Sequence, residues 1–350
     1  MIRYTTISRP NASFICANSG FGFVSYFEEL FAPCERLYII KGGPGTGKSS
    51  FMEKAARRAE AQGLLVERIC CSSDPYSLDG ILIPQRALGI TDGTAPHVCE
   101  PTLPGAREQL IDPGQFWDGA RLHAQKQEIL ALNTQKRALY ASALSLIEGA
   151  KNAALCRHGL LASHINEEKK ERLLRKLSKK ANAPAGTAQT RLISSLGMKG
   201  ALQLDTYTRQ AKEIYTILPY YGTELLLLEA LLKKLKEEQR TLIFCPDPVT
   251  LLPEALFFEH SKVLIRCGTP LGSGAEQKIH TKKLLSPALE ASCILRSLQK
   301  QEEGLLESAL ILLKNMQDCH FALEKIYQDA MDFDAFEQYQ AVLLEKMLPQ

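Results

Sequence analysis

The sequence lacks any long apolar run and any strong excess of one charge. The longest candidate for a membrane span starts at Leu225 and is interrupted by Glu229 and Lys233, so we expect no membrane span. The 42 Lys and Arg residues nearly balance the 39 Asp and Glu residues, and the net charge is +3. This balance argues against a general nucleic-acid-binding or membrane-surface protein.

The sequence also lacks a paired cysteine motif. None of its 10 cysteines forms a C-x-x-C pair, and Cys70 and Cys71 are adjacent within a predicted strand. Buried, reduced thiols explain this usage better than metal ligation does. The first residues do not have the pattern of a signal peptide. We therefore expect a cytoplasmic protein.

The length and composition indicate a globular α/β chain with more than one unit. Hydrophobic residues make up 45% of the 350 residues and charged residues 23%, which is ordinary for proteins with a large core. A chain of this length is typical of two compact domains.

One short stretch has the pattern G-x-x-x-x-G-K-[ST], and it follows the apolar residues 37–40. The pattern with its following serine consists of Gly42, Gly43, Pro44, Gly45, Thr46, Gly47, Lys48, Ser49 and Ser50. A buried strand before it and a helix after it are the flanks that a phosphate-binding P-loop needs. The glycines let backbone N–H groups converge on phosphate oxygens at the positive end of the helix. We expect Lys48 to reach the β- and γ-phosphates and Ser49 to ligate Mg²⁺.

Further strand patterns surround this loop. Short β-type runs at residues 13–16 and 22–26 precede it, and runs at 64–71, 80–84 and 87–94 follow its helix, which we expect to end near Gln62. Strands alternating with a helix predict a parallel sheet of the P-loop NTPase type. From Phe116 to about Lys180 the apolar spacing becomes helical, and residues 181–190 read as a linker.

Beyond this linker the pattern begins again. Residues 213–217 match 36–40, residues 242–248 match 69–75, residues 263–269 match 88–94, and a helical tail ends both halves. We therefore predict a duplicated unit, with residues 1–180 as the nucleotide-binding half and 191–350 as a degenerate one. In the second half Lys48 and Ser49 are replaced by Leu225 and Leu226, which cannot bind phosphate or a metal ion.

A second Mg²⁺ ligand is expected at the end of a neighbouring strand. Asp74 and Asp92 both fit that place. Asp74 has a counterpart in the degenerate half, Asp247, whereas Asp92 has none. We therefore favour Asp92 as the metal carboxylate and Asp74 as a turn or cap residue.

Several further residues could take part in the chemistry, and their patterns are weaker. Thr94 or His97 could lie near the γ-phosphate or an attacking water, but a histidine after a proline is more often structural. Arg107 could stabilise phosphate charge, with Glu100 or Glu108 orienting the water. Trp117 is expected to anchor a helix in the core rather than to stack on a base.

Four stretches together resemble a family of uncharacterised bacterial ATPase-like proteins built from two P-loop-type halves. They are residues 41–50, 71–75, 92–97 and 104–108, and the similarity spans nearly the whole chain. The resemblance implies ATP as the nucleotide, since no N-K-x-D motif for guanine is present. It assigns no physiological substrate.

Three functions remain open on these patterns. The first is Mg²⁺-dependent ATP hydrolysis coupled to movement of the helical arms or to a protein partner on the degenerate half, with Lys48, Asp92 and Arg107 as catalytic residues. The second is a small-molecule kinase, with Arg107 or Arg121 on the phosphates. The third is an ATP-gated scaffold without turnover.

Overall fold

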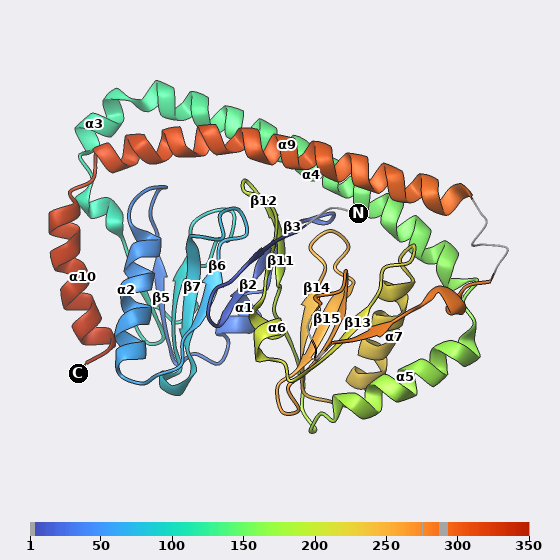
Figure 1. Cartoon of the computed structure of the whole chain (residues 1–350). Helices are drawn as coiled ribbons and strands as arrows, with labels where there is room; N and C mark the ends of the chain where they lie inside the picture. The colour runs from blue at the N-terminus through green and yellow to red at the C-terminus, as the bar shows by residue number, and fades with distance from the viewer. Residues whose placement is uncertain (1–3, 273, 275, 287–292, 350) are drawn as a thin grey trace.

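The computed structural model describes residues 4–272, 274, 276–286 and 293–349. Two α/β halves lie side by side, and a pair of long helices runs across both of them (Figure 1). In the described residues no helix is both long enough and apolar enough to cross a membrane.

The first half contains a six-stranded sheet in the order β2-β6-β7-β8-β5-β9. Its elements in chain order are β1 (Thr5–Ile7), β2 (Ala12–Phe14), β3 (Cys16–Ser19), β4 (Gly22–Ser25), α1 (Phe27–Phe31), β5 (Arg36–Ile40), α2 (Lys48–Ala61), β6 (Glu67–Cys70), β7 (Leu78–Ile83), η1 (Pro84–Arg86), β8 (Leu88–Asp92), β9 (Glu108–Ile111), η2 (Pro113–Phe116), α3 (Gly119–Ala124), α4 (Lys126–Ala162) and α5 (Glu167–Ala181).

The sheet is mixed, which corrects the prediction of a parallel sheet. Strand β5 pairs in parallel with β8 and β9, and β2 with β6, but β7 runs antiparallel to both β6 and β8. The physical reason is connection length. Only residues 71–77 join β6 to β7, and η1 turns the chain into β8. A parallel crossover needs a dozen residues or more.

The second half contains another six-stranded sheet, in the order β10-β14-β15-β16-β13-β17. Its elements are β10 (Ala188–Thr190), β11 (Ser194–Gly197), β12 (Gly200–Leu204), α6 (Thr206–Gln210), β13 (Glu213–Ile217), α7 (Thr223–Glu237), β14 (Leu242–Pro246), β15 (Pro253–Phe258), β16 (Val263–Cys267), β17 (Glu276–Ile279), η3 (Lys282–Leu284), α9 (Cys293–Asp329) and α10 (Phe333–Met347).

The two sheets have the same connectivity. Ranked along the chain within its own half, each sheet has its strands in the order 1-3-4-5-2-6. The directions also agree, because in each sheet only the fourth-ranked strand is antiparallel to its neighbours. The predicted linker is shorter than expected, since its last three residues form β10 and pair with β14.

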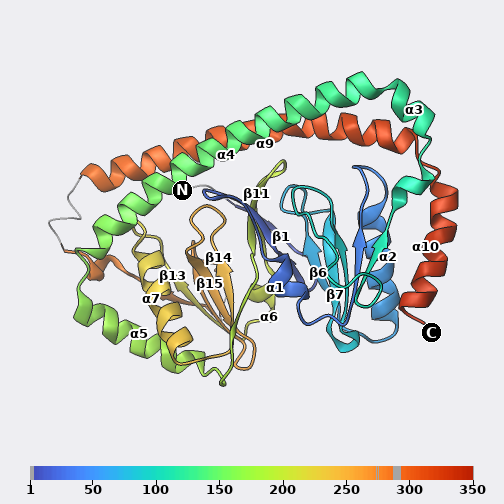
Figure 2. The ribbon, with the colours of Figure 1, turned by 180° about the vertical axis from the view of Figure 1, so that it is seen from behind.

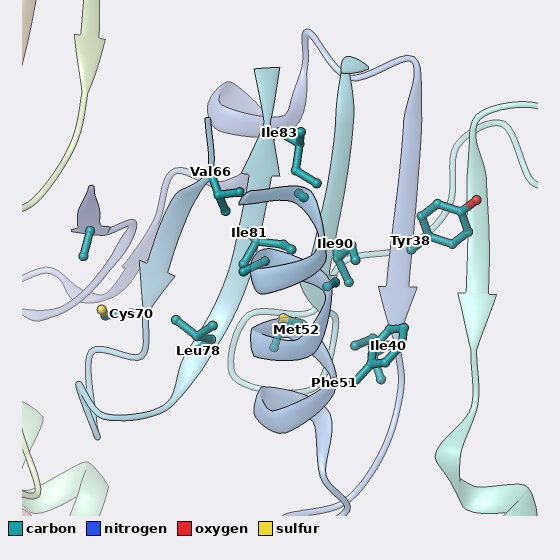
Figure 3. Close-up of a cluster of buried hydrophobic side chains, with 14 of the residues drawn as sticks. Tyr38, Ile40, Phe51, Met52, Val66, Cys70, Leu78, Ile81, Ile83 and Ile90 are labelled. Atoms are coloured by element: carbon teal, nitrogen blue, oxygen red, sulfur yellow. The ribbon is translucent and has the colours of Figure 1, made fainter. Parts of the chain in front are cut away.

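Helix α2 lies against the first sheet and buries its apolar face there (Figure 3). Phe51 and Met52 of α2 contact a cluster that includes Ile40, Ile81 and Ile90 from three strands. This packing fixes the direction of α2, and with it the position of the loop that joins β5 to α2.

Each half ends in a helical arm, α4 with α5 in the first half and α9 with α10 in the second. The last helix of each arm packs on the sheet of the other half. Helices α4 and α9 lie side by side and run in opposite directions, as both views show (Figures 1 and 2). At the end of α4, α5 packs Leu177 into the core of the second sheet. At the end of α9, α10 packs Leu343 and Leu344 into the core of the first sheet. The boundary near residue 181 therefore separates two sheets, but each core contains a helix from the other half.

Candidate functional site

The loop between β5 and α2 has the backbone shape that its glycines allow. Gly45 and Gly47 have φ of +71° and +79°, and Gly47 is the N-cap of α2. Side chains other than glycine rarely adopt this left-handed conformation. The hydroxyl of Thr46 donates to the carbonyl of Gly43 at 2.9 Å and closes the turn. The loop thus delivers the chain to the positive end of a 14-residue helix, which favours a bound anion.

The Lys48 side chain lies against the backbone carbonyls of this loop. Its Nζ donates to the carbonyls of Gly42 and Gly43 at 2.8 and 2.7 Å, and it is 3.5 Å from Oδ2 of Asp92. Both charged side chains are largely buried, at 12% and 13% exposure. The sequence named Lys48 and Asp92 as partners in one site, and the structure brings them together.

Asp92 ends β8, next to the strand that leads into the loop. Its Oδ1 accepts from the backbone N–H of Thr94 at 2.9 Å and from the hydroxyl of that residue. The Thr94 hydroxyl is also 3.1 Å from the carbonyl of Gly42. Thr94 therefore ties the end of β8 to the loop and orients the Asp92 carboxylate toward Lys48.

Ser49, in the first turn of α2, contacts the start of β7. Its Oγ accepts from the backbone N–H of Leu78 at 2.9 Å. This bond places the residue after Leu78, Asp79, beside the loop as well. The side chain of Asp79 is buried, and among the described residues its Oδ2 has no hydrogen-bond partner.

Sequence reasoning missed Asp79. The last β7–β8 pair is Gly80 with Thr91, and Asp79 and Asp92 each lie one residue beyond it, with the Thr91 hydroxyl 3.3 Å from the Asp79 carbonyl. Burial raises the pKa of the Asp79 carboxyl; His97 and Lys48 oppose that rise and Asp92 adds to it. A carboxylate at the start of an otherwise apolar strand was the available signal, but its neighbours became visible only with the antiparallel pairing of β7.

His97 lies in the connection after β8, three residues beyond Thr94, and its ring is near Asp79. Its Nε2 is 3.8 Å from Oδ1 of Asp79. The imidazole stacks on Phe27, with ring centroids 5.4 Å apart. The aromatic contact holds the ring in place, so His97 touches Asp79 and not the glycine loop itself.

The C-terminal helices contact the outside of the loop. A Cβ built on Gly45 would lie 2.7 Å from the backbone oxygen of Glu324 in α9, and one on Gly43 would lie 3.1 Å from the ring of Tyr327. The ring of Phe336 in α10 comes within 3.5 Å of the corresponding position on Gly47. Glycine is therefore also the residue that lets the arm pack this closely.

Titratable residues of α4 and α9 lie near Lys48. The Nζ of Lys136 in α4 is 3.1 Å from Nδ1 of His320 in α9, and Nε2 of His320 is 3.4 Å from Glu324. Burial lowers the pKa of Lys136, and Lys48 adds to the effect. Hydrogen bonding to His320 is the main cause that lowers the pKa of Glu324. The arm thus brings its own titratable groups to the loop.

Arg107 does not lie at the loop, which corrects its assignment as a catalytic residue. Its guanidinium donates to the carbonyls of Cys34 and Phe31 at 2.8 and 2.6 Å. Its backbone carbonyl accepts from Leu37 at the start of β5, whereas the loop follows the end of β5. Because β9 is parallel to β5, Arg107 and Glu108 lie at the amino-terminal ends of these strands, whereas the loop lies at the carboxyl-terminal end of β5.

The remaining candidates have local partners. Glu100 forms an ion pair with Lys41 at 2.6 Å, and Arg121 pairs with Asp329 on the arm. Asp74 accepts from the backbone N–H of Tyr76, two residues later in its own turn. The Trp117 ring contacts the Tyr327 ring at 5.3 Å between centroids.

In the second half, a carboxyl group of the chain itself occupies the loop between β13 and α7. Thr223 donates to the carbonyl of Tyr220 at 2.8 Å, the same turn as that made by Thr46. The buried carboxylate of Glu224 then accepts from the N–H groups of Tyr220 and Gly222 at 2.9 and 3.2 Å. These backbone donors are bound to a side chain in the first turn of α7, so they are not available to a phosphate.

The donor set of the first loop suits Mg²⁺ bound together with a nucleotide. Ser49 and Asp92 offer only oxygen atoms, which Mg²⁺ prefers, and this ion commonly uses one or two carboxylates plus phosphate oxygens. Within the described part of the chain, no group of three or more His, Cys, Asp or Glu residues could hold a metal by itself. A metal here would depend on the nucleotide to complete its ligands.

Comparison of the chain with protein-family models, with curated proteins and with solved structures found no match.

Proposed function

We propose that this chain is a P-loop NTPase that binds Mg²⁺–ATP at residues 42–50 and hydrolyses it. The observation that carries the proposal is the position of Lys48, held between the loop carbonyls and 3.5 Å from Asp92 at the end of the neighbouring strand. A lysine on a glycine loop, a hydroxyl one residue later and a strand-end carboxylate are the parts that phosphoryl transfer requires.

The residues divide the work in a simple way. The loop and the start of α2 hold the phosphates through backbone N–H groups, and Lys48 neutralises charge on the β- and γ-phosphates. Ser49 and Asp92 would hold Mg²⁺, which supplies further positive charge at the phosphates when it is bound. Thr94 orients Asp92 through the two contacts described above.

We infer in addition that the two halves are copies of one unit and that only the first is active. The common strand order and the common hydroxyl turn at Thr46 and Thr223 support a duplication. The loss of the lysine and the internal Glu224 carboxylate support inactivity of the second loop. ATP rather than GTP follows from the family resemblance.

The packing of α9 and α10 on the loop supports coupling of nucleotide turnover to the arms. Because a Cβ at Gly43, Gly45 or Gly47 would lie within 3.5 Å of these helices, the loop leaves them little clearance, and a change in loop shape on binding or hydrolysis would act on the arm directly. A scaffold without turnover would use the same contacts.

The test is binding and phosphate release by the full chain, in parallel with Lys48→Ala and Lys54→Ala. Lys54 is on the same helix, is 44% exposed and pairs with Glu337, so it serves as the matched control. We expect Mg²⁺-dependent ATP binding and release of phosphate from the wild type and Lys54→Ala, and loss of release from Lys48→Ala.

Two other results would contradict the proposal. Absence of ATP binding by the folded wild type would remove the nucleotide site altogether. Transfer of the γ-phosphate from labelled ATP to a component of a metabolite extract, with no release to water, would replace hydrolysis by kinase activity.

A further inference from the structure

Hydrolysis requires a group that orients the attacking water, and the predicted residues for that role are not available. Glu108 lies at the amino-terminal end of β9, at the other ends of the strands from the loop. Glu100 is 70% exposed and paired with Lys41. Gly93, which follows Asp92, has no side chain, and a Cβ there would be 2.4 Å from Ile39 Cγ2. The strand that carries Asp92 therefore cannot supply a second carboxylate.

The antiparallel strand β7 supplies one. Asp79 and Asp92 each lie one residue beyond the β7–β8 pair of Gly80 with Thr91, and the Leu78–Ser49 hydrogen bond holds the neighbouring backbone against the first turn of α2. Lys48 and Asp92 both act on its charge, which places the three groups in one electrostatic environment. Asp92 is already engaged with Lys48 and Thr94.

One carboxylate oxygen of Asp79 is an acceptor whose hydrogen-bonding capacity is unused in the part of the chain that the structure describes. The Asp79 carboxylate is buried, its Oδ1 faces Nε2 of His97, and the Cys71 thiol donates a hydrogen bond to the carboxylate, whereas Oδ2 has no partner of its own among the described residues. A buried carboxylate oxygen without a partner is costly and uncommon in native proteins. Such an atom beside a phosphate loop indicates an unfilled role in binding a small polar molecule.

Resting on the proposed ATPase function, we propose that Asp79 is a catalytic residue that orients the attacking water and that His97 positions Asp79. The Asp79 carboxylate accepts a hydrogen bond from the water, whose oxygen forms a bond to the γ-phosphorus. The bond from that phosphorus to the β–γ bridging oxygen breaks, and its electron pair leaves on ADP. One proton of the water stays on the phosphate product, and the other passes to solvent.

The experiment compares the wild type with Asp79→Asn, Asp79→Glu and Glu254→Gln in the full chain. Glu254 is buried and directly precedes Ala255, which pairs with Arg266, as Asp79 directly precedes Gly80, which pairs with Thr91, so it is a matched control. For Asp79→Asn we expect kcat to fall about 100-fold or more, with the Kd for Mg²⁺–ATP within about threefold of the wild type.

The other variants sharpen the result. Asp79→Glu keeps a carboxylate and should retain more activity than Asp79→Asn, while Glu254→Gln should match the wild type. His97→Asn should lower kcat about tenfold with little change in KM, since it acts only through Asp79. Thermal melting of each variant verifies that it is folded, and Asp79→Asn, which replaces a buried carboxyl group by an amide of nearly the same size, is not expected to unfold.

Several outcomes would overturn the inference, and they differ from failure of the proposed function. Wild-type kcat in Asp79→Asn would exclude a role in the reaction. Loss of Mg²⁺-dependent binding in that variant would make Asp79 a metal ligand instead. Loss of turnover in Glu324→Gln, with Asp79→Asn active, would assign the water to the arm. In each case wild-type hydrolysis stands. A folded wild type that neither binds nor hydrolyses ATP would instead overturn the ATPase and this inference together.

Discussion

At the scale of single residues, Gly45 combines two constraints that can be separated. Its φ of +71° disfavours any side chain, and a Cβ would also lie 2.7 Å from the backbone oxygen of Glu324. Gly63 has nearly the same φ, +76°, with nothing within 4 Å of the corresponding position. It therefore isolates the cost of the backbone conformation.

We predict that Gly45→Ala destabilises the chain more than Gly63→Ala does. The left-handed conformation costs roughly 1–2 kcal/mol in each variant, and only at Gly45 must α9 move away from the loop as well. Urea unfolding without nucleotide measures the difference. Equal losses in the two variants would mean that the arm yields without cost at this contact.

The buried pair of Arg157 and Glu302 joins α4 to α9 with an N–O distance of 2.5 Å. Burial raises the pKa of Glu302 from an ordinary 4.5 to about 7, against the opposing effect of Arg157. The folded state therefore holds a proton that the unfolded state releases between these two values. The free energy of unfolding should then decrease as the pH rises through that range.

We predict that Glu302→Gln removes this pH dependence. The variant should resemble the wild type near pH 5 and become the more stable of the two above pH 7, by at most roughly 3 kcal/mol. Denaturant titrations of both proteins at a series of pH values measure the gap. A gap that does not change with pH would show that Glu302 titrates normally in the folded chain.

At the scale of elements, α10 covers the outer side of α2. Phe336 on α10 is 2% exposed, and its ring lies 5.4 Å from the ring of Phe116. Val342 on the same helix is 70% exposed. The two positions therefore contrast a buried and a solvated site on one element.

We predict that Phe336→Ala lowers the free energy of unfolding by about 3–4 kcal/mol, and that Val342→Ala changes it by less than about 0.5 kcal/mol. Chemical denaturation gives both values, and hydrogen exchange should show faster opening of α2 in Phe336→Ala alone. Similar values for the two variants would mean that α10 contributes little to the first core.

At the scale of the whole molecule, the exchanged arms make the two halves interdependent. Beyond the arm helices, β1 pairs in parallel with β12, and Phe14 and Leu192 exchange backbone hydrogen bonds at 2.8 and 3.0 Å. Neither sheet keeps its full cover of helices without the other half.

We predict that fragments 1–186 and 187–350 co-purify as a one-to-one complex when they are expressed together. Each fragment alone should lack a cooperative thermal transition, because its core is missing α10 or α5. Size-exclusion chromatography and calorimetry test this. A fragment 1–186 that melts cooperatively as a monomer would contradict the interdependence of the cores.

The local parts of the site were predictable from the sequence because they are contiguous. The glycine pattern predicted the loop, the apolar runs predicted its strand and helix, and the comparison between halves singled out Asp92. The partners from distant segments were not predictable. Asp79 depends on the pairing of β7, and Lys136, His320 and Glu324 depend on where the arm helices cross the loop. Arg107 was misplaced because the sequence does not show at which end of the strands the residue lies.

The sequence by itself determined the local elements of this protein. Loop glycines allow left-handed backbone angles, apolar periods of two and 3.6 residues predict strands and helices, and the second half has Leu225 and Leu226 at the positions that match Lys48 and Ser49. Tertiary structure alone decided which elements share a core. Short connections made β7 antiparallel, and burial of the apolar faces of α5 and α10 was satisfied by exchange between halves. The amphipathic pattern of a helix requires a buried face but does not specify which sheet provides it.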